Sequence, residues 1–370
     1  MNDRFHDDCI QILTERARRG AIDRRTFIKA MGFLAGLPLA ARMGVSWAAD
    51  RNLVLVNWGG DAIEAYRNAW TEGFERETGI PVDIDGSGPT RGAIESQAAG
   101  GNPGWDIVDA DPFTSMNLGE MGKLRPIDYS RVDRDKVREG MTWEHGVANY
   151  LYSYVLAYDS DIYGDDAPRT WAEFWDTDTY PEQRTVYKWM NGVLEAALLA
   201  DGVAAEDLYP LDVERAMEKL AELDPFILSY WESGAQSQDL MMAGETPLGM
   251  VWHTRAHVMN QDTDGRIQWS YNNGFLVPSS WAVLENNPGG EEAAMDFIAY
   301  AQDPETQVAL FDAMTNGPAN PAADALIPEE KRHLNCASPE NMDKQIILDM
   351  EWYADHYGAT LEKFLDRIAA

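Results

Sequence analysis

Two histidines, His253 and His257, stand four residues apart in the stretch HTRAH. On a helix this spacing brings two imidazoles to the same side, where both could bind one metal ion. The glutamate that serves as the base in zinc proteases is missing, because Thr254 follows the first histidine. No nearby carboxylate–histidine grouping completes a set of three ligands. The sequence therefore favours structural or ligand-contacting histidines over a metal site, and it predicts no cofactor.

Other signatures of catalysis or anion binding are incomplete. The chain has no G-x-S-x-G elbow for a serine nucleophile, although a Ser–His pair distant in sequence stays open. The loop GSGPT, Gly86–Thr90, is rich in glycine but lacks the lysine of a phosphate-binding loop. It is either a loop whose free N–H groups hold an anion or a plain turn from a strand into a helix. Both interpretations remain open.

The first 49 residues have the features of an export leader. Arg24 and Arg25 precede an apolar run at 30–41, which is shorter than the roughly 20 residues that a membrane span needs. An arginine pair in this place is typical of the twin-arginine route, which exports folded proteins. Small residues before Asp50 then suit a signal peptidase. We expect cleavage near Ala48–Asp50 and a periplasmic mature protein.

The charge balance limits the choice of partners. The chain carries 62 acidic and 30 basic side chains, a formal net charge of −32. Such a field repels nucleic acid phosphates, so DNA and RNA are excluded as partners. A solvated acidic surface explains the charge without any specific partner. Cys9 would leave with the leader, so Cys336 has no partner for an internal disulfide.

Short strands alternate with helices in the part of the chain that follows the leader. The patterns predict strands over 53–58, 80–86 and 105–111 and helices over 62–79 and 90–101. Glycines stop the first strand and both helices. Alternation of this kind predicts an α/β protein with a largely parallel sheet.

The middle of the chain has a different pattern. Tyr150, Tyr152 and Tyr154 stand two residues apart in an extended run, which would present a row of aromatic rings on one face. A second α/β unit begins near Asp159. Later, a helix pair over 291–314 is broken at Asp303–Pro304, and the tail from 339 to 368 is predicted to be helical. No low-complexity linker is present, so strands should join the two units.

The order of these pieces resembles a known family. A leader, a first strand ending in NW, a helix closing on ETGIPV, the stretch GNPGWDIV, a late helix pair and the turn NGPANPAA occur in sequence. This resembles the extracellular solute-binding proteins of ABC importers, and among them the spermidine/putrescine-binding proteins. The resemblance covers nearly all of the chain after the leader. It implies a two-lobed periplasmic-binding-protein fold of type II, with a hinge and a ligand cleft between the lobes.

The same resemblance implies a division of the chain and a set of partners. Lobe 1 would comprise 50–158 and 272–330, lobe 2 would comprise 159–271, and 331–370 would be a C-terminal helical segment packed on both. The protein would be the periplasmic substrate-binding component of an ABC transporter, a monomer that delivers a small solute to an inner-membrane permease. The alternative is a periplasmic α/β hydrolase or metal-dependent enzyme, which would need a completed catalytic set.

Aromatic residues of the cleft carry over from the family only in part. Trp58 and Trp252 each follow an apolar strand and correspond to cleft tryptophans of the polyamine binders. Phe113 stands where the family offers an aromatic after the third strand, and Tyr154 joins them from the tyrosine row. The carboxylates that grip ammonium groups are absent, because Trp189 and Ser279 occupy their positions.

Charged residues near these positions point to a different ligand. Lys188, Arg255 and Arg91 are donors for a carboxylate, whereas Asp61 and Asp111 remain as acids for an amine. The sequence therefore favours a carboxylate-bearing ligand, including a zwitterion, over a pure polyamine. The alternative is that the basic residues face solvent or pair with the many acids, and that Asp61 and Asp111 bind a cation.

Overall fold

The computed structural model describes residues 52–101 and 103–369. The predicted export leader, its arginine pair and its cleavage site lie outside the described residues. Within them, no helix combines the length and the apolar character needed to cross a bilayer.

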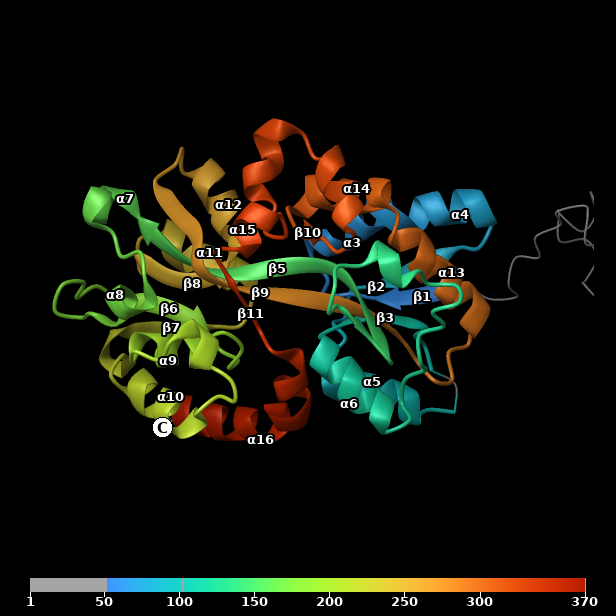
Figure 1. The fold of residues 1–370 in the computed structure, drawn as a ribbon, viewed down its shortest axis with the longest axis horizontal. Helices are drawn as coiled ribbons and strands as arrows, with labels where there is room; N and C mark the ends of the chain where they lie inside the picture. The colour runs from blue at the N-terminus through green and yellow to red at the C-terminus, as the bar shows by residue number, and fades with distance from the viewer. Residues whose placement is uncertain (1–51, 102, 370) are drawn as a thin grey trace, which may run out of the picture.

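One sheet connects the strands of the described residues, in the order β2-β1-β3-β9-β5-β8-β6-β7, with three short strands paired at its sides (Figure 1). The predicted strands over 53–58, 80–86 and 105–111 are confirmed as β1, β2 and β3, with ends that differ by a residue or two. The strands are β1 (Leu53–Val56), β2 (Val82–Asp85), β3 (Ile107–Ala110), β4 (Thr142–Trp143), β5 (Gly146–Asp159), β6 (Arg184–Tyr187), β7 (Ile227–Trp231), β8 (Leu248–Trp252), β9 (Ile267–Val283), β10 (Gly317–Pro318) and β11 (Ile346–Ile347).

The expectation of a largely parallel sheet is wrong for its centre. β1 pairs in parallel with β2 and β3, and β6 pairs in parallel with β7 and β8. The two longest strands, β5 and β9, run antiparallel to each other. β5 is also antiparallel to β8, and β9 is also antiparallel to β3. The local alternation of strands and helices predicts only neighbouring crossovers. It cannot show that β9 returns from a distant part of the chain to pair with β3.

β5 and β9 run through the middle of the molecule and join its two halves (Figure 1). We call lobe 1 the half that contains β1, β2 and β3, and lobe 2 the half that contains β6, β7 and β8. The first part of β5 pairs with β9 at 277–281, and its last residues pair with β9 at 267–270. The register shifts between Tyr154 and Leu156, where the paired strands pass from one lobe to the other.

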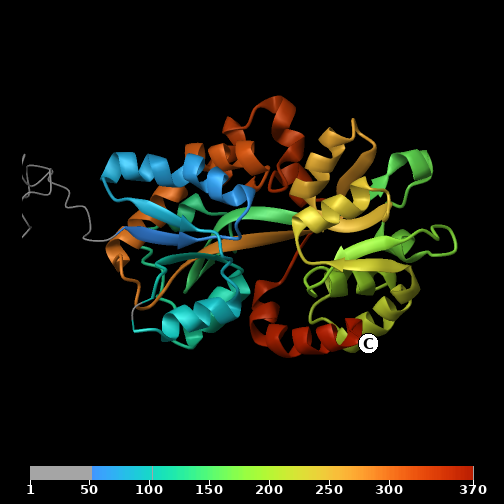
Figure 2. The same ribbon diagram turned by 180° about the vertical axis from the view of Figure 1, so that it is seen from behind.

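Helices cover both faces of the sheet (Figures 1 and 2). The longer helices are α3 (Asp61–Tyr66), which continues through η2 (Arg67–Thr71) into α4 (Glu72–Thr78), α5 (Arg91–Ala99), α6 (Pro112–Glu120), α9 (Val193–Ala200), α10 (Val213–Ala221), α11 (Gly234–Met242), α12 (His253–Asp262), α13 (Glu291–Ala301), α14 (Pro304–Met314) and α16 (Met350–Ile368). The shorter ones are η3 (Arg134–Lys136), α7 (Ser160–Tyr163), η4 (Gly164–Asp166), α8 (Trp171–Trp175), η5 (Ala205–Asp207), η6 (Asp224–Phe226), η7 (Pro321–Leu326), η8 (Glu329–Leu334) and α15 (Pro339–Met342).

Local signals in the sequence account for several helix ends. The continuous helix from Asp61 ends at Gly79, whose φ of 74° is the left-handed conformation that glycine adopts without strain. Thr90 caps α5 by accepting from the Ala93 N–H. The break at Asp303–Pro304 separates α13 from α14, as predicted. The tail is not one helix, because β11 separates α15 from α16 and pairs with β9 at Phe275.

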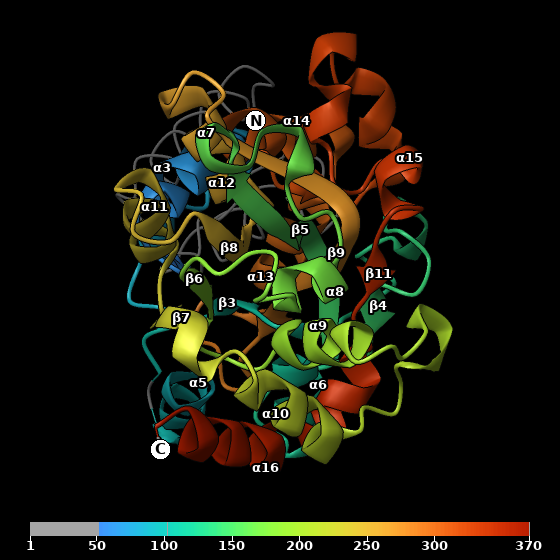
Figure 3. The same cartoon turned by 90° about the vertical axis from the view of Figure 1, so that its left-hand side faces the viewer.

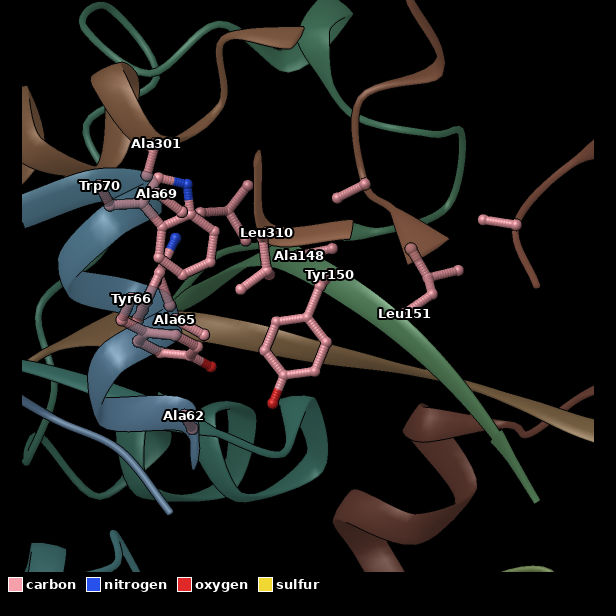
Figure 4. Close-up of a cluster of buried hydrophobic side chains, with 14 of the residues drawn as sticks. Ala62, Ala65, Tyr66, Ala69, Trp70, Ala148, Tyr150, Leu151, Ala301 and Leu310 are labelled. Carbon is pink, nitrogen blue, oxygen red and sulfur yellow. The ribbon is translucent and has the colours of Figure 1, made fainter. Parts of the chain in front are cut away.

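The core of lobe 1 is built around large aromatic side chains (Figure 4). Tyr66 and Trp70 lie on one face of the helix that starts at Asp61, and both rings pack edge-on against Trp281 of β9. All three side chains are buried. Burial of a large apolar side chain is worth about 1.5–3 kcal/mol. This packing therefore fixes the helix after β1 against the sheet and holds the loop between them in place.

Candidate functional site

The carboxyl ends of the strands in the two lobes point toward each other. β3 and β5 are both antiparallel to β9, so they run in the same direction. β8 is antiparallel to β5, and β6 is parallel to β8. β3 therefore points toward lobe 2, while β6 and β8 point toward lobe 1. Ligands of α/β proteins bind beyond the carboxyl ends of such strands, so the candidate site is the region between the lobes.

Six aromatic side chains gather at this position, and we call them the aromatic cluster. They are Tyr152, Tyr154, Tyr187, Trp189, Trp231 and Trp252. The ring of Tyr187 lies 5.3 Å from that of Tyr154, 4.4 Å from that of Trp231 and 5.8 Å from that of Trp252. Tyr152 packs edge-on against Tyr154 and Trp252. The structure thus brings together Tyr154, Trp189 and Trp252, three of the residues predicted from sequence.

Asp111 follows β3 directly and lies beside this cluster. It precedes α6 but makes no capping hydrogen bond to that helix. Burial raises its pKa to about 7, and the nearby charge of Asp109 adds to the rise. Burial also raises the pKa of Tyr152, Tyr154 and Tyr187, and the charge of Asp111 contributes to each shift. A carboxylate within electrostatic reach of three tyrosine rings is suited to an ammonium group, which an ion pair and ring faces both stabilise.

Ser279 is buried and bound to a buried carboxylate. Its hydroxyl donates to Asp109 Oδ1 at 2.7 Å, and the side chain is 2% exposed. Asp109 also accepts from the Tyr66 hydroxyl at 2.6 Å and from the Asn149 amide at 2.8 Å. Burial raises the pKa of Asp109, and these hydrogen bonds oppose the rise. Ser279 therefore ties β9 to β3 in the centre of the sheet, and its hydroxyl is already bound.

The three predicted basic residues all pair with acids. Arg91 donates to Glu95 at 3.0 Å on α5, and Lys188 donates to Glu232 at 2.5 Å. Arg255 at the start of α12 donates to Asp61 at 3.4 Å, from lobe 2 to lobe 1. Two of the acids are largely exposed. Asp61, the partner of Arg255, has 80% of its side-chain surface accessible, and Glu232, the partner of Lys188, has 58%. Exposed pairs of this kind contribute little free energy, so neither acid holds its cation firmly.

The loops after β1 and β2 touch each other below Trp58. A Cβ on Gly59, whose φ is 75°, would lie 2.5 Å from the Gly86 carbonyl oxygen, so only glycine fits there. The indole of Trp58 is 49% exposed and lies over Gly88. The N–H groups of Gly88 and Thr90 donate to backbone carbonyls, and that of Ser87 donates to the Asp85 side chain. This favours the interpretation of 86–90 as a turn rather than an anion cradle.

The two histidines have different surroundings. His253 is fully buried, and its Nδ1 accepts from the Ser153 N–H at 3.0 Å, so its Nε2 donates to the Thr315 carbonyl at 3.0 Å. Burial lowers its pKa to about 4. His257 lies instead on a groove of about 1760 Å³ between α12, the end of α14 and residues 324–344. Across 52–101 and 103–369, no group of three or more His, Cys, Asp or Glu is placed to hold a metal ion.

The groove and the candidate site are separate places. None of the site residues predicted from sequence lines the groove.

Phe113 is buried in α6, and its ring lies 4.4 Å from that of Tyr357 and 5.6 Å from that of Tyr353. Both tyrosines belong to α16, which packs against α6. Burial raises the pKa of Tyr357, and the charge of Asp111 adds to this rise, so Tyr357 lies within electrostatic reach of Asp111.

Four residues around the candidate site were not among the predicted site residues, namely Tyr152, Tyr187, Trp231 and Tyr357. Tyr152 belongs to the alternating tyrosine row, which could have identified it, since residues two apart share a face. Tyr187 directly precedes Lys188, but β6 is too short for its pattern to indicate a direction. Tyr357 lies 105 residues after Trp252, the last residue of β8, and no motif links it to the site. Its position depends on how α16 packs, which the sequence does not determine.

Comparisons with known proteins agree with this architecture. The family described as bacterial extracellular solute-binding protein matches residues 69–334. The gamma-aminobutyric acid-binding protein of Pseudomonas aeruginosa is 31% identical over 91% of this chain and 95% of its own. The spermidine/putrescine-binding periplasmic protein of Salmonella typhimurium is 23% identical over 91% and 97%. The solved structure of the Atu4243 GABA receptor has a TM-score of 0.79 and 32% identity, covering 86% of this chain and 98% of that one.

The fold, the facing strand ends and the family match lead to one conclusion. The two lobes joined by β5 and β9 form the type II periplasmic-binding-protein fold. Solute-binding proteins of this kind capture a small molecule and deliver it to a permease, and the family is not a class of enzymes. The chain belongs to the bacterial extracellular solute-binding protein family and is the solute-binding component of an ABC transporter.

Proposed function

We propose that this protein is a periplasmic receptor for a small zwitterion that carries an amine at one end and a carboxylate at the other. Gamma-aminobutyric acid is the first ligand to test, because relatives that are 31% and 32% identical are named for it. The observation that carries the proposal is the position of Asp111 beside the rings of Tyr152, Tyr154 and Tyr187. We also propose that Trp58, Trp252 and Phe113 contribute to the walls of the site.

Asp111 is the proposed partner of the amine. An unpaired charge in a partly buried position is costly, and this carboxyl reduces the cost by holding a proton up to about pH 7. A ligand ammonium would replace that proton and leave an ion pair with aromatic faces around it. Ring faces add about 0.5–2 kcal/mol to such a contact, depending on how far it is desolvated.

Arg255 is the proposed partner of the carboxylate. It lies in the first turn of α12, just beyond the end of β8, and its side chain packs against Gly234 at the start of α11. Its bond to Asp61 is long, at 3.4 Å, and Asp61 is 80% exposed. A ligand carboxylate can engage the guanidinium through both of its oxygens, whereas Asp61 contacts it through one oxygen at 3.4 Å. Lys188 is a second donor, bound at present to Glu232.

A pure polyamine fits this arrangement less well. A closed diamine needs an acid at each end, since removing one partner of a buried ion pair costs about 3–5 kcal/mol. The family positions for the second acid are occupied by Trp189 and by Ser279, whose hydroxyl is committed to Asp109. Asp61 is the remaining candidate, and it faces solvent. Similarity to a spermidine/putrescine-binding protein keeps the polyamine as the second candidate.

Calorimetric titration of gamma-aminobutyrate and putrescine into four proteins tests the proposal. Asp111→Asn should weaken both ligands by about 100-fold or more, because both need the carboxylate. Arg255→Ala should weaken gamma-aminobutyrate at least about tenfold and leave putrescine unchanged. Arg215→Ala, an arginine paired with Asp201 far from the site on α10, is the control and should change neither. Putrescine binding in preference to gamma-aminobutyrate, insensitive to Arg255→Ala, would establish the polyamine instead.

Location and assembly are part of the same proposal. We infer export to the periplasm by the twin-arginine route, supported by Arg24, Arg25 and the apolar run after them. Replacing both arginines by lysine should retain the precursor in the cytoplasm, which fractionation of cells would detect.

We also propose a monomer, to be measured by light scattering with and without ligand. The titrated ligands should be recovered unchanged, since capture and delivery require no bond to break.

A further inference from the structure

The C-terminal helix α16 lies across both lobes at one edge of the molecule (Figures 2 and 3). The chain reaches it by way of β11, which pairs with β9 at Phe275 and Leu276 near the crossing between lobes. α16 then packs against α6 of lobe 1 and α10 of lobe 2. The helix is therefore in a position to close the region between the lobes from that side.

Lobe 2 holds α16 by buried and surface contacts. The Tyr353 hydroxyl donates to Glu195 Oε1 at 2.7 Å, and the Tyr209 hydroxyl donates to the same oxygen at 2.6 Å. Glu195 and Tyr353 are both fully buried. Toward its end, α16 forms ion pairs through Lys363 and Arg367, with Glu214 and Asp224 of lobe 2. These contacts fix the rotation of the helix about its axis and hence the direction of Tyr357.

Tyr357 is a side chain of α16 that packs beside the start of α6, next to Asp111. Its ring lies 4.4 Å from that of Phe113, the second residue of the helix that begins after Asp111. One turn earlier, the Ala354 carbonyl accepts from the Asn117 amide at 3.4 Å. Tyr357 is only partly exposed, and burial together with the charge of Asp111 raises the pKa of its hydroxyl. Phe113 of lobe 1 and the anchoring of α16 to lobe 2 together fix the position of the Tyr357 ring, within electrostatic reach of Asp111.

We propose that Tyr357 forms an end wall of the ligand site and limits the length of the solute that this receptor accepts. A ring held by Phe113 on one side and by the anchored helix on the other cannot move aside without a loss of packing. A longer ligand whose carboxylate stays on Arg255 would push its amine past Asp111 and would have to displace this ring. This inference rests on the proposed function for the class of ligand, and it adds a specificity residue outside the resemblance and outside the sequence-predicted set.

The length of the ligand is the variable that tests the end wall. Affinities for 3-aminopropionate, 4-aminobutyrate, 5-aminopentanoate and 6-aminohexanoate should be measured by calorimetry for the wild type, Tyr357→Phe and Tyr357→Ala. Tyr357→Ala should raise the affinity for 6-aminohexanoate relative to 4-aminobutyrate by about tenfold or more, since a methylene in a closed pocket is worth about that factor. Tyr357→Phe keeps the ring and should keep the wild-type ratio. Glu362→Ala, exposed on the same helix, is the matched control.

An unchanged ratio in Tyr357→Ala, with the protein folded, would overturn the end wall and leave the proposed function standing. If the wild type binds none of the four amino acids, the proposed function falls, and a second measurement still decides about Tyr357. Fluorotyrosine placed at position 357 should show a ¹⁹F resonance that moves when Asp111 is replaced by asparagine, with no ligand present. A resonance that does not move would mean that Tyr357 lies outside the site.

Discussion

The Arg255 guanidinium donates to the Asp61 carboxylate at 3.4 Å and so joins α12 of lobe 2 to α3 of lobe 1. Both residues lie just beyond the carboxyl end of a strand, β8 in one case and β1 in the other. The pair therefore spans the two lobes beside the candidate site. Arg255 is 27% exposed in its side chain and Asp61 is 80% exposed, so water screens much of the attraction.

Asp61→Asn should have little effect on stability. An exposed ion pair contributes about 0–1 kcal/mol, and the long distance places this one at the low end. The free energy of unfolding, measured in urea, should change by less than about 1 kcal/mol. The affinity for a carboxylate-bearing ligand should stay the same or rise, because Arg255 loses a competing partner. A loss of both stability and affinity would identify the pair as a latch that holds the lobes together.

Ligand binding should depend on pH through Asp111. Its pKa in the unliganded protein is raised to about 7 by burial and by Asp109, and an ammonium ligand requires the ionised form. The affinity for an amine should be constant above pH 7 and should fall about tenfold for each pH unit below it. Titrations between pH 5.5 and 8 would measure this slope, with Asp111→Asn as the control. An affinity independent of pH would exclude Asp111 as the amine partner.

The same carboxyl has the opposite effect on the stability of the unliganded protein. The folded state keeps the Asp111 proton up to about pH 7, whereas an unfolded aspartate loses it near pH 4. Between these values the folded state binds more protons than the unfolded state. The contribution of Asp111 to stability is therefore full at about pH 4 and decreases as the pH rises to 7.

His253 should contribute to stability with the reverse dependence on pH. Burial lowers its pKa to about 4, while an unfolded histidine titrates near 6.5. As the pH falls from 6.5 to 4, the unfolded state takes up a proton that the folded state does not, which costs up to about 3 kcal/mol. Comparing the unfolding free energy of the wild type and His253→Gln across this range isolates the effect. His257→Gln is the control, because His257 is only partly buried.

The sequence predicts the separate elements better than their arrangement. An apolar run stopped by glycines identifies β1, and the Asp303–Pro304 break separates α13 from α14, because both signals are local. The pairing of β9 between β3 and β5 depends on contacts made across the whole chain. It could be reached through the resemblance to a family, and not through periodicity.

For the candidate site, too, the sequence indicates where a residue stands relative to a strand better than which way its side chain points. Trp252 was predicted because residues beyond strand ends gather at one edge of a sheet, and Asp111 was predicted as one of two remaining acids for an amine. Ser279 stands in an equally suitable place in the sequence, but its hydroxyl is bound to Asp109 inside the sheet. Whether a side chain in a long central strand faces the core or the site depends on the register with β3 and β5. That register is a property of the folded sheet.

Trp58 and Trp252 should report ligand binding by fluorescence. Trp58 is 49% exposed, so a ligand that covers it changes its environment more than that of a buried indole. Trp252 lies in contact with Tyr187 and Trp231 and should respond less. Trp58→Phe should remove most of the ligand-induced change in emission, and the double variant with Trp252→Phe should remove nearly all of it. A change that persists in the double variant would place the ligand away from both.

Gly234→Ala tests Arg255 without changing its charge. A Cβ at position 234 would lie 2.7 Å from Arg255 Nε and 3.0 Å from its Cγ, so the arginine side chain must move. Gly234 is the first residue of α11, where alanine favours the helix and should stabilise it slightly. Binding of gamma-aminobutyrate should weaken several-fold while the unfolding free energy stays constant or rises.

Gly92→Ala provides the matched comparison for this substitution. Gly92 lies in the first turn of α5, and a Cβ there meets open space. It should leave both stability and ligand affinity close to the wild type. Putrescine, which needs no cationic partner, should bind Gly234→Ala and the wild type equally well. An equal loss of affinity for putrescine and gamma-aminobutyrate would mean that the new methyl group disturbs the site as a whole. If the affinity for gamma-aminobutyrate is unchanged in Gly234→Ala, Arg255 is removed from the proposed set of ligand-binding residues.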